Sequence, residues 1–174
     1  MSCYLLAKKA TNEEPTQILW NTILTTWFPP VGPMAYKLAI KSPTLASDGE
    51  PDAIVIEVRF IGNGDVRSST QLLENQIFMV ECKSSEYDTT SGWRNAATQL
   101  IDYLVDNTNG STRLFGALAI GTKVEVYEWQ YGRNPPLFPI HAGRLDLGKA
   151  ADRHTFEVAM EQVRTEAWDY LLQR

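Results

Sequence analysis

The stretch IFMVECKSSEYDTT, residues 77–90, decides how this chain is organised. A hydrophobic run over 76–82 leads into Glu81, Cys82 and Lys83 and then breaks into a polar, turn-like segment. Side chains alternate faces along a strand, so Glu81 and Lys83 should share one face while Cys82 points to the other. Burying a carboxylate and an ammonium is costly unless something compensates both charges. The two residues are therefore either an ion pair at an exposed strand end or part of a functional site.

The composition limits the classes of protein to consider. The chain has 174 residues, which suits one domain with a full hydrophobic core, and we expect a single domain over 1–174. Its formal net charge of -5 argues against a surface coated in basic residues. The two cysteines, Cys3 and Cys82, make no disulfide framework, and no segment reaches the roughly 18 apolar residues of a membrane span. We expect an intracellular protein, cytoplasmic or nuclear, that has no membrane partner.

Hydrophobic periodicity predicts the order of the elements. The first helix follows a capping box formed by Thr11 and Glu14 and stops at Pro29. Two of the strands should form an antiparallel hairpin through the loop around 62–65. The pattern predicts a mixed central sheet flanked by helices, an α/β or α+β domain. The expected elements are a helix over about 11–28, strands at 35–41, 53–60 and 76–84, a helix over 91–106, strands at 114–120 and 123–129, and a helix over about 151–172.

A third charged residue joins Glu81 and Lys83 if that hairpin forms. Asp52 ends the segment Asp48-Gly49-Glu50-Pro51-Asp52, at the start of the second strand. In an antiparallel pair the start of one strand lies beside the end of the other, so Asp52 should neighbour Glu81 and Lys83. Two close carboxylates repel, and a shared proton or a bound cation relieves the repulsion. Two carboxylates, water and phosphate oxygens suit Mg²⁺, so the cluster predicts a metal site where Lys83 stabilises charge on a scissile phosphate.

Three motifs together resemble the PD-(D/E)XK nuclease superfamily, which has the restriction-endonuclease-like fold. They are Pro51-Asp52, then Glu81-Cys82-Lys83, then Gln99-Leu100-Ile101-Asp102-Tyr103 on the following helix. The resemblance covers about residues 11–129 and implies an αβββαβ core, with the loop and helix of 130–174 outside it. The overall pattern, with a Gly-Thr-Lys-Val hairpin after the helix, resembles stand-alone domains found in filamentous fungi.

The resemblance also implies roles for individual residues. Asp52 and Glu81 would bind Mg²⁺ or Mn²⁺, with Cys82 contributing only its backbone carbonyl. The catalytic set would be Asp52, Glu81, Lys83 and Gln99, and the QxxxY pattern extends it to Tyr103. Some members use a glutamate of the first helix as an extra ligand, for which Glu13 and Glu14 are the candidates here.

Two functions from different classes follow. The first is a Mg²⁺-dependent endo- or exonuclease that hydrolyses phosphodiester bonds of nucleic acid, DNA in preference to RNA. The second is a catalytically silent nuclease-like fold that binds nucleic acid or another protein, because fold does not determine function. The complete set of Asp52, Glu81 and Lys83 favours the enzyme, whereas the acidic charge balance favours weak or partner-dependent binding. A homodimer is compatible with both.

Several of these residues also have a purely structural interpretation. Gln99 would then be a surface amide of the helix, and Tyr103 a half-buried packing residue. Glu57 and Arg59 share a strand face and would form an exposed pair. His141 and His154 have no partner at ligand spacing, so we expect both to be structural or solvent-facing.

Overall fold

The computed structural model describes residues 2–31, 35–42, 50–61, 71–106 and 111–172. The helix–strand order predicted for residues 11–129 is present, while one short helix and two short strands had no periodic signal to predict them. In chain order the elements are α1 (Cys3–Lys8), α2 (Glu14–Trp27), β1 (Ala35–Ile40), β2 (Ala53–Ile61), β3 (Gln71–Lys83), the 3-10 helix η1 (Ser85–Tyr87), α3 (Thr90–Asp106), β4 (Arg113–Ile120), β5 (Lys123–Gln130), β6 (Leu137–Pro139), β7 (Leu145–Asp146) and α4 (Ala150–Leu172).

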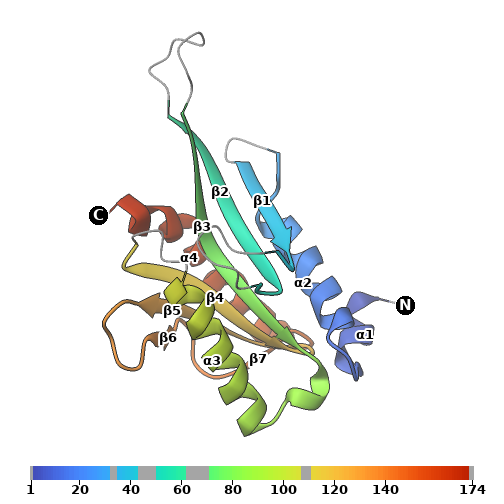
Figure 1. Cartoon of the computed structure of the whole chain (residues 1–174). Helices are drawn as coiled ribbons and strands as arrows, with labels where there is room; N and C mark the ends of the chain where they lie inside the picture. Colours follow the sequence, from blue (N-terminus) through green and yellow to red (C-terminus); the bar gives the residue numbers. More distant parts are fainter. Residues whose placement is uncertain (1, 32–34, 43–49, 62–70, 107–110, 173–174) are drawn as a thin grey trace.

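A seven-stranded sheet forms the centre of the described structure, and helices lie on both of its faces (Figure 1). The strands follow the order β1-β2-β3-β4-β5-β6, and β7 pairs with β5. All pairings are antiparallel except that of β3 with β4, which are joined through α3. The predicted mixed sheet flanked by helices is confirmed.

The two faces of the sheet carry separate hydrophobic layers. On one face α2 and α4 meet, with the rings of Trp20 and Phe156 packed edge to face at 5.7 Å between centroids. On the other face α3 places Leu100 against Gly116 of β4, where an added Cβ would meet the Leu100 methyl carbons at 3.1 Å. Cys82 lies in the α2/α4 layer, as its predicted packing role requires.

The β2–β3 hairpin positions the strand ends that matter for the site. Its antiparallel register pairs Ala53 with Val80, with an irregularity between Val55 and Ile56. This pairing confirms the predicted hairpin, whereas its loop around 62–65 lies outside the described residues, as do Asp48 and Gly49.

The predicted capping box at the first helix is wrong. Glu13 occupies the N-cap of α2, and no side chain makes a capping hydrogen bond there. Pro15 lies in the first turn and has no N–H group, so the helix start has fewer donors for a cap to satisfy. The Glu13 carboxylate is thereby left to interact with the end of β3.

Candidate functional site

A buried lysine–carboxylate pair lies at the end of β3. The Glu81 Oε1 atom is 2.6 Å from the Lys83 Nζ atom, with side chains only 3% and 15% exposed. The two residues share one face of the strand, as the alternation predicted, while Cys82 faces the opposite layer. Glu81 is therefore buried and Lys83 is partly buried, so the pair is more enclosed than an ion pair at an exposed strand end.

Asp52 lies beside this pair and is held by two donors. The side-chain amide of Gln17 donates to its Oδ1 at 2.5 Å, and the backbone N–H of Cys82 donates to its Oδ2 at 2.7 Å. The second bond places the Asp52 carboxylate against the peptide between Glu81 and Cys82. Asp52 therefore lies close to Glu81, as predicted. Hydrogen bonds to both of its carboxylate oxygens fix its orientation.

Sequence reasoning missed Gln17. This residue is buried on α2, three positions before Trp20 and seven before Leu24, which both lie in the core. Residues at this spacing share a helix face, so an amide at Gln17 had to find a buried partner. A polar residue on the apolar stripe was the signal that pointed to it.

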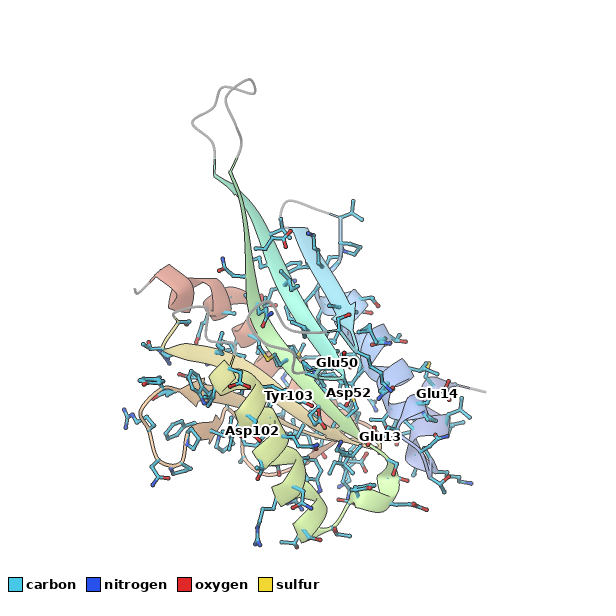
Figure 2. All side chains as sticks on the ribbon, viewed as in Figure 1. Glu13, Glu14, Glu50, Asp52, Asp102 and Tyr103 are labelled. Atoms are coloured by element: carbon cyan, nitrogen blue, oxygen red, sulfur yellow. The ribbon has the colours of Figure 1, made fainter. Side chains whose placement is uncertain are left out.

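The start of α2 adds a third carboxylate. The Glu13 Oε1 atom lies 3.3 Å from the Lys83 Nζ atom, so Lys83 bridges Glu81 and Glu13. Of the two glutamates considered for this helix, the structure brings Glu13 to the site and leaves Glu14 exposed. Figure 2 shows Asp52 between Glu13, which precedes α2, and Tyr103 of α3.

A second lysine borders Asp52 from β1. The backbone N–H of Lys41 donates to the carbonyl oxygen of Asp52 at 3.3 Å, and the positive charge of Lys41 acts to lower the pKa of the Asp52 carboxyl. Lys41 has φ 43, a left-handed conformation that is unfavourable for a residue with a Cβ. Its exposed side chain and that of Lys83 both act on Asp52 in this direction.

The site holds more negative charge than its surroundings compensate. Burial raises the pKa of Asp52, opposed by the Cys82 N–H and supported by the Glu13 charge. Burial, opposed by the Lys83 hydrogen bond and supported by the Asp52 charge, raises the pKa of Glu81 to about 7. Burial acts to lower the pKa of Lys83, but Glu81 and Glu13 raise it above its ordinary value overall. At neutral pH the cluster therefore favours an added proton or cation.

The donor set at this place suits a hard divalent cation. Asp52 and Glu81 offer carboxylate oxygens, and Mg²⁺ accepts one or two carboxylates and completes its shell with water and phosphate oxygens. The described part of the chain contains no group of three or more His, Cys, Asp or Glu side chains that could hold a metal ion. The Cys82 thiol points away and burial raises its pKa, so only its backbone carbonyl is a candidate ligand.

The polar face of α3 overlooks the lysine, as predicted. Gln99 and Lys83 line one open cavity of about 430 Å³, while Leu100 and Leu104 are fully buried in the core. Tyr103 is half-buried one turn further on. Burial, together with the charges of Glu81 and Asp52, raises the pKa of its hydroxyl.

Other polar residues have structural explanations. His141 accepts a hydrogen bond from the Val126 N–H at 3.0 Å through its Nε2 atom, and His154 is exposed on α4. The expectation of an exposed Glu57–Arg59 pair is wrong for Glu57, which is 0% exposed because β2 lies between two strands and beneath α2. The Arg59 side chain lies outside what the structure describes.

Within the described residues, every helix is too short or too polar to cross a bilayer. Comparison of the chain with protein-family models, with curated proteins and with solved structures finds no match.

Proposed function

We propose that this protein is a divalent-metal-dependent nuclease of the PD-(D/E)XK type that hydrolyses phosphodiester bonds, with DNA as the first candidate substrate. The observation that carries the proposal is the convergence of Asp52, Glu81 and Lys83 at the paired ends of β2 and β3. Support also comes from the element order from α2 to β4, which is that of the αβββαβ core of the superfamily.

The residues divide the work as follows. Asp52 and Glu81, with the Cys82 carbonyl, would hold Mg²⁺ or Mn²⁺, which when bound lowers the pKa of a water ligand and polarises the phosphate. Gln17 and the Cys82 N–H fix the direction of the Asp52 carboxylate. Such fixed donors need no rearrangement when a cation or substrate arrives.

Lys83 supplies the positive charge that the reaction requires. Glu81 and Glu13 raise its pKa, so it stays an ammonium at neutral pH and can stabilise charge developing on the phosphate oxygens. Gln99 lines the same cavity and can donate a hydrogen bond to the phosphate or to the attacking water.

A specific observation favours the second candidate, a silent binding module. Lys83 already contacts two carboxylates, and both oxygens of Asp52 already accept hydrogen bonds. A network satisfied in this way can persist without a cation and serve only to tie α2, β2 and β3 together.

The two candidates are separated by metal-dependent cleavage. Labelled single-stranded and double-stranded DNA and RNA are incubated with the protein in Mg²⁺, in Mn²⁺ and in chelator, alongside thermal melts under the same conditions. The nuclease proposal expects cleavage that requires the metal, and a melting temperature that rises with metal concentration, since a ligand of the native state stabilises it. Melts indifferent to millimolar metal, together with no cleavage of any substrate, would leave the binding module.

A further inference from the structure

The open cavity of about 430 Å³ beside Lys83 is lined by an aromatic ring and by amide and hydroxyl groups as well as by the lysine. Its walls come from Lys83, from η1 and from α3. The residues are Lys83, Tyr87, Gly92, Asn95, Thr98 and Gln99. Its size falls within the range of small-molecule sites, roughly 300–1,000 Å³.

Three polar side chains form one wall. Asn95, Thr98 and Gln99 stand at helical spacing on a single face of α3. Within the described residues, the amides of Asn95 and Gln99 make no hydrogen bond, whereas the Thr98 hydroxyl donates to the Arg94 carbonyl at 3.2 Å. Two free amides thus offer both donors and acceptors to an occupant of the cavity.

Tyr87 adds an aromatic surface to the same cavity. Its side chain is 49% exposed although its backbone is fixed at both ends, by the bond of its N–H to Ser84 O at 3.0 Å and of Thr89 N–H to its own carbonyl at 2.6 Å. An exposed ring on a fixed backbone is preorganised for binding, because the backbone loses little conformational freedom when a ligand stacks on the ring.

Neighbouring contacts hold this segment against the rest of the fold. The Ser85 hydroxyl donates to the Ala10 carbonyl at 2.8 Å, and the Trp93 indole donates to Asp88 at 3.0 Å. A Cβ at Gly92 would overlap the carbonyl oxygen of Tyr87, so only glycine lets η1 pack this closely on α3. The position of η1 relative to α3 is therefore set by backbone packing.

We propose that this cavity binds an unpaired nucleobase next to the scissile phosphate, with Tyr87 stacking on the base and Asn95 and Gln99 bonding to its edge. Aromatic stacking and amide contacts to base edges are the usual means of recognising unpaired nucleotides. A base within a duplex cannot reach such a cavity unless it is extruded. This inference rests on the proposed function, and it names the substrate class as single-stranded or locally unpaired nucleic acid.

The charge of the protein supports base contacts as a source of affinity. With a formal net charge of -5 the chain gains little from general attraction to phosphates. Lys83 can attract one phosphate locally, and the adjoining cavity then adds a contact that does not depend on bulk charge.

Equilibrium binding tests the proposal with labelled oligonucleotides, measured by fluorescence anisotropy in Ca²⁺, a hard cation with the same oxygen ligands. The probes are a single strand of DNA, the same strand in RNA, its duplex, and a single strand carrying abasic sites. We expect the single strands with bases to bind more tightly than the duplex and the abasic strand. The stronger of the DNA and RNA arms identifies the sugar of the natural substrate.

The variants locate the effect in the cavity. Tyr87→Ala should weaken binding of the base-containing strand by roughly 5- to 100-fold, the range for loss of one stacked base, and leave the abasic strand unaffected. Tyr87→Phe should retain the affinity. Asn95→Ala should reduce the differences between strands of the four bases. Tyr131→Ala removes another exposed tyrosine, 71% exposed at the opposite end of β5, and should change nothing.

The outcomes separate this inference from the nuclease proposal. If Tyr87→Ala loses affinity equally for base-containing and abasic strands, or loses none, the cavity assignment is overturned even if metal-dependent cleavage is present. Base-dependent binding through Tyr87 without cleavage supports the cavity and leaves the protein a binding module. Wild-type protein that binds no oligonucleotide overturns the cavity assignment, and the cleavage assay then decides the nuclease proposal separately. Melts of each variant show whether it is folded.

Discussion

Two lysine–carboxylate pairs near the start of α3 have opposite properties. In the Glu81–Lys83 pair the side chains are 3% and 15% exposed, whereas in the Asp88–Lys123 pair they are 29% and 41% exposed. Partial burial acts to raise the pKa of Asp88, but hydrogen bonds from Lys123 and Trp93 lower it overall. Burial raises the pKa of Glu81 despite its hydrogen bond from Lys83.

The difference shows what a site requires beyond a pair of opposite charges. Asp88 and Lys123 neutralise each other in partial solvent and connect η1 to β5. Glu81 and Lys83 lie among two further carboxylates, Asp52 and Glu13, and Lys83 contacts two of the three acids. Buried excess charge is costly to the fold, and such perturbed groups gather at functional sites.

The largest expected contrast between the pairs is catalytic. Lys83→Ala should lower metal-dependent cleavage by roughly 100- to 1,000-fold, the usual effect of removing one group that stabilises transition-state charge. Metal affinity should survive because Asp52 and Glu81 remain. Lys123→Ala is the matched control and should cleave like wild type. Cleavage rates at saturating metal and substrate measure the contrast, and equal rates for the two variants would remove Lys83 from the mechanism.

The pairs should also differ in how pH affects stability. The folded protein keeps a proton on Glu81 up to about pH 7, whereas the unfolded chain releases it near the ordinary pKa of 4.5. The contribution of Glu81 to the free energy of unfolding is therefore greatest below pH 4.5, and it falls as the pH rises to 7. In chelator, Glu81→Gln should gain stability over wild type across this window, by up to about 3 kcal/mol.

Urea unfolding of the wild type and Glu81→Gln at several pH values checks this prediction. Parallel stability curves for the two proteins would mean that Glu81 titrates normally. Asp88→Asn serves as the comparison of opposite sign: it should lose stability relative to wild type as pH rises, because the pKa of Asp88 is lowered in the folded state.

A smaller effect should follow from separating η1 from α3. Gly92→Ala introduces a Cβ that overlaps the Tyr87 carbonyl, and we expect a loss of about 1–3 kcal/mol in the free energy of unfolding. The displacement of Tyr87 in this variant should also weaken the binding of single-stranded oligonucleotide. Thr90→Ala changes an exposed neighbour and is the control for both measurements. Unchanged stability in Gly92→Ala would show that the segment can move away at little cost.

The smallest effect should come from the Asp88–Lys123 pair itself. Lys123→Ala should lower the free energy of unfolding by about 0.2–1 kcal/mol, as is usual for partly exposed ion pairs, and added salt should reduce the difference. Denaturant titrations at low and high salt measure it. A loss of several kcal/mol that salt does not affect would place this pair in the same class as Glu81–Lys83.

The sequence by itself predicted the longer elements and brought together one half of the candidate site. Alternation placed Glu81 and Lys83 on one face, and hairpin pairing placed Asp52 beside them, because strand geometry has a fixed period of two. Helical periodicity likewise separates Leu100 and Leu104, which are buried, from Gln99, which lines the cavity beside Lys83.

Only the tertiary structure decided what surrounds that half of the site. Gln17 and Glu13 come from α2, far from β3 in sequence, and no local pattern states where a helix start docks on a sheet. The burial of Glu57 and the raised pKa of Glu81 likewise depend on layers packed from distant segments. Periodicity is a local property of the backbone, whereas desolvation and charge coupling are sums over everything that lies nearby in space.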